Sequence, residues 1–248
     1  MAKALKSKQT GADIAVYEAR MAEMAAAQSA IEVTASQWFK TKSGQLSFDG
    51  NKLKDNKINV VVVGSAYEHA RYEGDYDPDN PQSPVCFALS ESGKDMKPAP
   101  ESSTPQSESC AACRWNAFGT SDKGAGKGCK QTRRLALIAA DTLDDAEHAP
   151  IALIRVPVTS GKTWATYVKS ITETLKRPTL GVVTELAVVP DDKTQFKFVF
   201  TFVEKLGAVV GALFARTDEA RSMLLTPFSK FEAPKPKPKP RAGKKAKY

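Results

Sequence analysis

The sequence predicts an α+β fold that is mainly β: a five-stranded OB-like barrel with a long insertion, flanking N- and C-terminal helices and a disordered basic tail. Two observations predict it. The expected elements follow the order strand, strand, insertion, strand or strand pair, helix, strand, strand. An OB barrel has this order, with its helix between the third and fourth strands. The insertion also holds every cysteine of the chain. A generic α+β sandwich with the same order of elements is the alternative.

The chain is expected to divide into four parts, each with its own composition. A run rich in Ala, Met and Glu, without Gly or Pro, predicts a helix over residues 12–30. The four parts are an N-terminal helical arm at 1–30, an OB-like core at 31–205 with the insertion at 81–130, a C-terminal helix at 206–228, and a disordered Lys/Pro-rich tail at 229–248.

Segments rich in β-branched and aromatic residues predict the strands, and the strongest is KINVVVVGSA at 57–66. In FKFVFTFV the phenylalanines alternate with other residues, which predicts that they share one face. The other strands are expected at 31–40, 133–140, 151–158, 180–189 and 196–203. Apolar residues at helical spacing predict a helix over 162–175. A closing helix is expected over 209–226.

The four cysteines, Cys86, Cys110, Cys113 and Cys129, all lie in a loop-like segment rich in Pro, Ser and Gly. A loop of this length within a compact domain needs something to order it. In the spacing Cys-x23-Cys-x2-Cys-x15-Cys, the CxxC pair can chelate one ion from a single turn, and the other two ligands can come from separate strands. We therefore expect one structural Zn²⁺ with a closed tetrahedral shell, whose binding orders the insertion.

Three alternatives to zinc remain open for the cysteines. Four thiolates also suit an iron–sulfur cluster. Disulfides would require an oxidising compartment, and four unrelated buried thiols would require no ligand at all. A thioredoxin-type CxxC lacks the βαβ pattern that frames such motifs.

Charge is concentrated at the C-terminal end of the chain. The net charge is +8, and residues 229–248 hold eight Lys/Arg and one Glu, or +7, which leaves about +1 for the rest. No apolar run approaches the roughly 18 residues of a membrane helix. The basic N-terminus is not followed by an apolar signal region. A cytoplasmic location is therefore expected.

A second cluster of charge follows the CxxC pair. Residues 114–134 hold six basic residues against one acidic residue, with aromatic residues and glycines among them. Rings that stack on bases and cations that meet phosphates are what a single-strand binder needs. The alternative for Trp115 is packing over the metal. The candidate nucleic-acid contacts are Trp38, Phe39, Tyr72, Trp115, Phe118, Lys123, Lys127, Lys130, Arg133, Arg134, Lys162, Trp164 and Lys169.

Catalytic motifs are weak, and an enzyme is not expected. The Gly161-Lys162-Thr163 sequence lacks the glycine that a P-loop needs five residues earlier, where Val156 stands. The two histidines, His69 and His148, have no partner nearby in the sequence. The acidic turn at 190–193 lacks the further carboxylates of a two-metal nuclease.

Three segments resemble phage-encoded, zinc-containing single-stranded-DNA-binding proteins: PVCF at 84–87, CAACRW at 110–115 and GKGCKQTRRLAL at 126–137. The resemblance extends over about 31–203. It implies an OB-type protein that coats single-stranded DNA during replication or recombination in the cytoplasm of the phage's host. It also implies that the four cysteines are the metal ligands. A basic tail in place of the acidic tail common in such proteins is a departure, and it would add salt-sensitive phosphate affinity.

Three functional hypotheses follow from these patterns. The first is a sequence-tolerant single-stranded-DNA-binding protein with one structural zinc, for which RNA is an alternative ligand and replication or recombination proteins are expected partners. The second is a zinc-stapled regulatory or adaptor protein that binds a host protein such as RNA polymerase. The third is a metal-dependent nuclease. The sequence leaves the oligomeric state open.

Overall fold

A computed structural model describes residues 38–74, 82–122 and 124–228, together with positions 16, 17, 20, 21 and 24. Residues 1–36 and 37–248 form two separate units. In the first unit the five described positions are helical. The rest of the predicted helix at 12–30, the start of the predicted strand at 31–40 and the predicted tail at 229–248 lie outside the described residues. No described helix is long and apolar enough to span a membrane.

The second unit begins with a small antiparallel sheet that the sequence analysis did not predict. Its strands are β1 (Lys40–Lys42), β2 (Gln45–Phe48) and β3 (Asn51–Lys52), in the order β1-β2-β3. Both connections are two-residue turns, Ser43-Gly44 and Asp49-Gly50, in which all four residues have positive φ. This is the backbone of a type I′ hairpin turn, which favours Gly at its second position.

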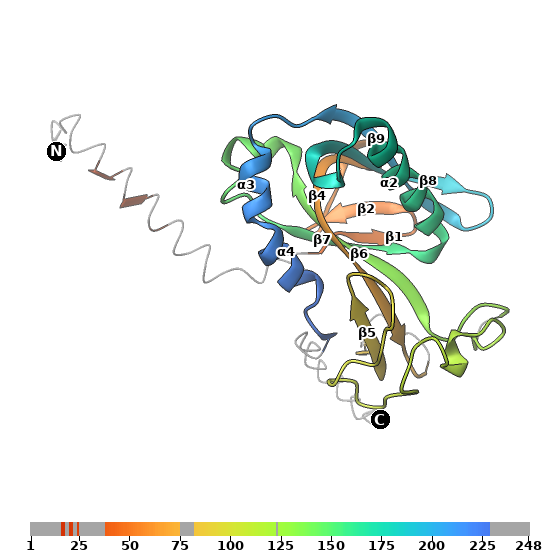
Figure 1. Ribbon diagram of the computed structural model, residues 1–248. Coiled ribbons are helices and arrows are strands. Elements are labelled where there is room, and N and C mark those ends of the chain that lie inside the picture. The colour runs from red at the N-terminus through yellow and green to blue at the C-terminus, as the bar shows by residue number, and fades with distance from the viewer. Residues whose placement is uncertain are drawn as a thin grey trace, which may run out of the picture. The chain divides into compact units, whose positions relative to one another are not determined.

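The main sheet is antiparallel throughout, with six strands in the order β7-β6-β4-β8-β9 and with β5 paired to β4 (Figure 1). The long strand β4 pairs with β6 on one edge, while its other edge pairs first with β8 and then with β5. The strands are β4 (Lys57–Arg71), β5 (Cys86–Ser90), β6 (Lys130–Ala139), β7 (Ala152–Pro157), β8 (Val182–Asp191) and β9 (Gln195–Lys205).

Both faces of this sheet are covered. Helix α2 (Gly161–Leu175) and the small sheet pack on one face, where Trp164 lies 4.9 Å from Phe200 between ring centroids. Helices α3 (Val210–Ala215) and α4 (Thr217–Leu224) cover the other face. The single closing helix predicted over 209–226 is therefore two helices. The short 3₁₀ turns are η1 (Lys54–Asn56), η2 (Arg114–Asn116), η3 (Ala140–Asp145), η4 (Val158–Ser160) and η5 (Thr179–Gly181).

The described strands form an open sheet, so the closed five-stranded barrel is not the observed architecture. No ladder between described residues joins β7 to β9. The outer edge of β7 is occupied instead, because the backbone N–H of Phe39 donates to the carbonyl of Leu153 over 2.7 Å. On β9, the backbone N–H of Phe198 donates to the Ser160 hydroxyl. These contacts satisfy backbone groups that a closing ladder would otherwise use.

A smaller part of the second unit extends from the main sheet; we call it the cysteine lobe (residues 67–74, 82–122 and 124–134). It contains the last part of β4, all of β5 and the start of β6 (Figure 1). Its apolar cluster is small, consisting of Ala70 and Phe87 packed against Phe228, with Tyr72, Leu89 and Ala99 at its margin. The rest of the second unit, which we call the body, holds the two larger clusters.

A buried ion network joins the cysteine lobe to the body. Glu68 on β4 is 2% exposed and accepts hydrogen bonds from Arg134 on β6 and Arg155 on β7. Arg134 is fully buried and also donates to the carbonyls of Leu224 and Thr226, at the end of α4. Burial alone would raise the pKa of Glu68, but the charges of Arg155 and Arg134, with hydrogen bonds from Thr132 and Arg134, lower it.

Replacing Glu68 with Ala should strongly destabilise the protein, because it leaves Arg134 and Arg155 without their counter-charge. We expect a loss of about 3–5 kcal/mol in the free energy of unfolding, measured by urea denaturation at neutral pH. Because the folded-state pKa of Glu68 lies below its ordinary value, its contribution is present above the unfolded pKa. It is lost as pH falls through the folded pKa.

The control is Glu173→Ala, which removes an exposed ion pair with Lys169 on α2 and should cost less than about 1 kcal/mol. Equal effects of the two substitutions would contradict the assignment of Glu68 as the compensating charge.

Candidate metal centre and nucleic-acid surface

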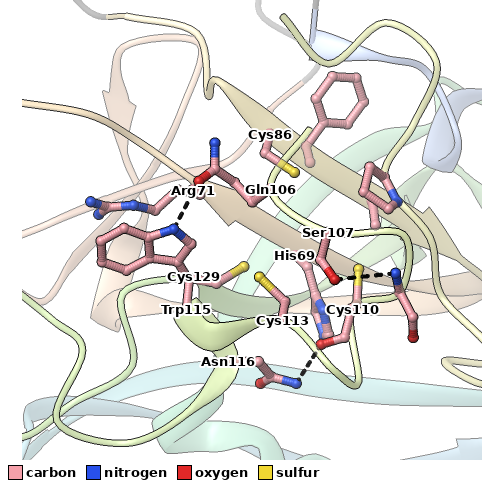
Figure 2. Close-up of a pocket in the computed structure, with 14 residues that line it drawn as sticks. His69, Arg71, Cys86, Gln106, Ser107, Cys110, Cys113, Trp115, Asn116 and Cys129 are labelled. Atoms are coloured by element: carbon pink, nitrogen blue, oxygen red, sulfur yellow. Dashed lines mark hydrogen bonds between the residues drawn. The ribbon is translucent and has the colours of Figure 1, made fainter. Parts of the chain in front are cut away.

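The four cysteines come from three segments and line a single pocket in the cysteine lobe (Figure 2). Cys86 is the first residue of β5 and is paired with Arg71 of β4. Cys110 and Cys113 flank a turn that leads into η2, and Cys129 immediately precedes β6. Backbone hydrogen bonds hold these segments in place. The N–H of Cys129 donates to the carbonyl of Trp115, and the N–H of Cys110 donates to that of Met96.

The pocket is narrow, with a free volume of about 20 Å³. That is room for one particle the size of a water molecule. All four cysteines are free thiols. Within residues 38–74, 82–122 and 124–228, no three His, Cys, Asp or Glu side chains stand already grouped as a metal ligand set.

The thiols influence one another electrostatically. Burial, together with the neighbouring charges of Cys86 and Cys113, raises the pKa of Cys110 to about 11. Burial and the other three cysteines raise the pKa of Cys129 to about 12. Protonated thiols are thus favoured when no cation is near. A bound divalent cation would reverse this preference, since it stabilises the thiolates directly.

Two further residues of β4, His69 and Arg71, line the same pocket. Their side chains lie on one face of the strand because they are two positions apart. Burial and the charge of Lys127 lower the pKa of His69, which keeps its ring neutral. Sequence analysis found no partner for His69, and it did not extend the predicted strand at 57–66 as far as Arg71. The register of β4 with β5, which pairs Arg71 with Cys86, reveals their position.

Trp115 forms one wall of the pocket and is held on several sides (Figure 2). The guanidinium carbon of Arg71 lies 3.9 Å from the ring centroid, and that of Arg114 lies 4.4 Å from it. The indole N–H donates to Gln106 over 2.8 Å. A Cβ at Gly128 would come within 2.7 Å of the indole, so the close approach requires glycine here. This placement favours the packing role for Trp115 over a free base-stacking role.

Phe118 is the most exposed ring of the cysteine lobe, with 78% of its surface accessible. It lies in a short hairpin-like segment whose ends meet through a bridge between Phe118 and Lys127. The Lys127 ammonium lies 5.2 Å from the ring centroid. The lobe holds two other cation–aromatic pairs: Arg133 with Tyr67, where the guanidinium carbon lies 3.7 Å from the ring centroid, and Lys130 with Tyr72, where the ammonium lies 5.5 Å from it.

The structure separates the predicted nucleic-acid residues into groups. Trp115, Phe118, Tyr72, Lys127, Lys130 and Arg133 are together in the cysteine lobe, whereas Lys123 lies outside the described residues. Lys162 and Lys169 are exposed on α2 in the body. Trp38 lies beside Arg155, and the guanidinium carbon of Arg155 is 4.0 Å from the centroid of the Trp38 ring.

Three of the predicted contacts require correction. Phe39 is 7% exposed and Trp164 is 5% exposed, and both belong to the core beneath α2. Arg134 is fully buried in the Glu68 network. Their rings and charge are therefore used for packing and pairing inside the fold, and we leave them out of the candidate surface. Residue type alone could not distinguish them from the exposed aromatic and basic residues nearby.

Comparison with known proteins found no matching family model, no matching curated protein and no matching solved structure.

Trp115→Ala should loosen the cysteine lobe, because Arg71, Arg114 and Gln106 all lose their contact with the indole. We expect a loss of about 2–4 kcal/mol in the local stability of the lobe. Hydrogen exchange of the lobe amides measures this, with the body amides as internal reference. Phe118→Ala is the matched control and should change stability by less than about 0.5 kcal/mol. Unchanged exchange in Trp115→Ala would contradict its structural role.

Proposed function

We propose that this chain is a sequence-tolerant single-stranded-DNA-binding protein, acting in DNA replication or recombination, with one structural zinc held by Cys86, Cys110, Cys113 and Cys129. The observation that carries the proposal is the cysteine lobe itself. There, four thiols share one pocket, and an exposed ring beside a cation, Phe118 with Lys127, lies on the same lobe. The proposal describes a binding protein and not an enzyme. It includes the host cytoplasm as the location if the gene is a phage gene.

Zinc suits the chemistry of the pocket. Four thiolates satisfy its tetrahedral preference and leave no coordination position open for catalysis. The small apolar cluster around Phe87 gives the lobe little burial of its own, so metal binding would supply much of its folding free energy. Each of the four ligands comes from a segment that is already held by backbone hydrogen bonds or by β pairing.

The order of the strands is compatible with an OB-type fold whose barrel is not closed. Leaving β5 aside, the strands run β4, β6, β7, β8 and β9 along the chain, with α2 between β7 and β8. Their order across the sheet, β7-β6-β4-β8-β9, would become an OB barrel if β7 and β9 met. In this correspondence the cysteine lobe is an elaboration of the connection between the first and second barrel strands. In OB folds that connection is one of those that bind oligonucleotides.

Single strands suit the exposed surface better than duplexes do. A ring such as Phe118 can stack on any unpaired base, and the neighbouring cations can meet the backbone without reading sequence. Arg114 and Lys130 are exposed, while Lys127 and Arg133 are half-buried beside their aromatic partners. The basic residues of 229–248 add further phosphate affinity, which should fall steeply with salt.

The adaptor alternative is favoured by a different surface. Phe202 and Val203, near the end of β9, are 39% and 43% exposed. A strand end with exposed apolar residues is a common protein-contact site.

The nuclease alternative gains no support from the predicted acidic turn. In that turn, Asp191 accepts a hydrogen bond from the Thr194 hydroxyl and forms an ion pair with Lys197, and these contacts lower the pKa of Asp191 to about 2. The turn joins β8 to β9 as a hairpin.

Elemental analysis of the purified protein should find about one zinc per chain. Cys113→Ser should weaken zinc binding by about 60- to 900-fold, because one thiolate supplies roughly a quarter of a binding free energy of about 10–16 kcal/mol. A competition assay with a chromogenic chelator measures the loss. Ser107→Ala, at a non-sulfur position of the same pocket, should bind zinc like the wild type. A zinc-free wild type that is fully folded would contradict the site.

Phe118→Ala should weaken binding to labelled oligo-dT by about 5- to 100-fold, which corresponds to about 1–3 kcal/mol for one lost stacking contact. Fluorescence anisotropy across a salt series measures both affinity and salt dependence. Lys130→Gln should lower the slope of log affinity against log salt by about 0.7. Lys52→Gln, on exposed β3 of the body, is the control and should change neither quantity.

The same titration on a chain ending at Phe228 separates the two leading hypotheses. The single-strand binder should retain most of its affinity for oligo-dT at low salt, whereas an adaptor with incidental affinity should lose nearly all of it. Absence of oligo-dT binding by the full chain at low salt would refute the proposed function.

A further inference from the structure

Buried polar atoms without a partner are concentrated at the cysteine pocket. Among the described residues, three buried side-chain nitrogen atoms make no hydrogen bond: His69 Nδ1, Arg71 Nε and Arg134 Nη2. The first two belong to residues that line the pocket with the four thiols. A buried polar nitrogen without a partner is costly and is rare in native proteins. The Nε–H of Arg71 is a donor, and the Nδ1 of His69 is a donor in the Nδ1–H tautomer, so acceptors placed in this pocket would satisfy both atoms.

Strand register directs both donors to the cysteine side of the lobe. His69 and Arg71 share one face of β4, and Cys86, opposite Arg71 on β5, shares it with them. Arg71 is held in place because its Nη1 donates to Asp122 over 3.2 Å and its guanidinium lies against Trp115. These contacts leave the Nε–H of Arg71 without a protein acceptor.

Metal-bound thiolates would provide the missing acceptors. Four thiolates around one Zn²⁺ carry a net charge of about −2, since the ion supplies two positive charges against four negative ones. Such a buried anionic centre is stabilised by N–H groups directed at its sulfur atoms. Outer donors of this kind orient the ligands and tune the metal in protein sites generally.

We propose that the Nδ1–H of His69 and the Nε–H of Arg71 donate hydrogen bonds to the metal-bound thiolates of the four-cysteine site. The proposal rests on the zinc site argued above and assigns two positioning residues to it. The donors withdraw electron density from the sulfur atoms, and they thereby lower the reactivity of the thiolates toward electrophiles. Arg71 also links the site to Trp115, so the metal, the indole and β4 form one packed unit.

Nuclear magnetic resonance of the full chain loaded with ¹¹³Cd tests this without any substitution. An N–H···S–Cd hydrogen bond transmits a scalar coupling from the proton to the metal. Proton–cadmium correlation should therefore show cross-peaks from the His69 Hδ1 and the Arg71 Hε. A ¹¹³Cd resonance in the four-sulfur range without either cross-peak would overturn the proposal while leaving the metal site intact. Absence of a four-sulfur resonance would overturn the metal site and this inference together.

Variants test the consequence for reactivity. His69→Leu and Arg71→Met remove the donors, and alkylation of the zinc-loaded cysteines by N-ethylmaleimide should become about 10-fold faster in each. Zinc affinity should fall by about 10- to 100-fold. His69→Asn and Arg71→Gln keep an N–H group near the same position and should restore most of the protection. Arg114→Met is the matched control, because Arg114 also contacts Trp115 but does not line the pocket. Equal rates in Arg114→Met and Arg71→Met would show that only the indole contact matters and would overturn the role of Arg71.

Discussion

The carboxylate of Glu68 is the charge on which the arrangement of the second unit depends. It sits where β4 leaves the two-sided core of the body and enters the cysteine lobe, and it pairs with arginines from β6 and β7. One of them, Arg134, in turn holds the end of α4 through two carbonyls. Three strands and a helix end thus share one buried ionic centre. Removing Glu68 would leave both arginines without their counter-charge, Arg134 in a medium of low dielectric.

The body and the cysteine lobe are stabilised by different means. The body buries the apolar side chains of five strands between α2 and the small sheet on one face and α3 and α4 on the other. The lobe has only a small apolar cluster. It relies on the packing of Arg71 and Arg114 against the Trp115 ring, on the hydrogen bonds of its turns and, by our proposal, on a metal. Regions with few buried apolar contacts open more easily than the core. Among the described residues, the lobe is therefore better suited than the body to an order that depends on a ligand.

The sequence was informative where one local signal dominated. The apolar run in β4 and the helical spacing in α2 predicted both elements, and the clustering of the cysteines anticipated that they share a pocket. The β1–β3 sheet was missed although Ser43-Gly44 and Asp49-Gly50 are recognisable hairpin turns, because its strands are only two to four residues long. Arg134 was misplaced because its partner, Glu68, lies 66 positions away. Arg216, between α3 and α4, donates to the carbonyls of Ala146 and Glu147, a contact that no local pattern reveals.

The end of the described fold has a mechanical consequence. Phe228, the last described residue, packs against Phe87 of β5, with ring centroids 5.1 Å apart, so the described chain ends at the cysteine lobe. The eight Lys and Arg residues that follow are tethered to that point. A polyanion bound to the lobe would encounter these charges at an effective concentration that is set by the length of chain joining them to Phe228, and not by the concentration of protein in solution. Once the polyanion is bound to the lobe, its binding to the basic residues of 229–248 would cost little additional entropy.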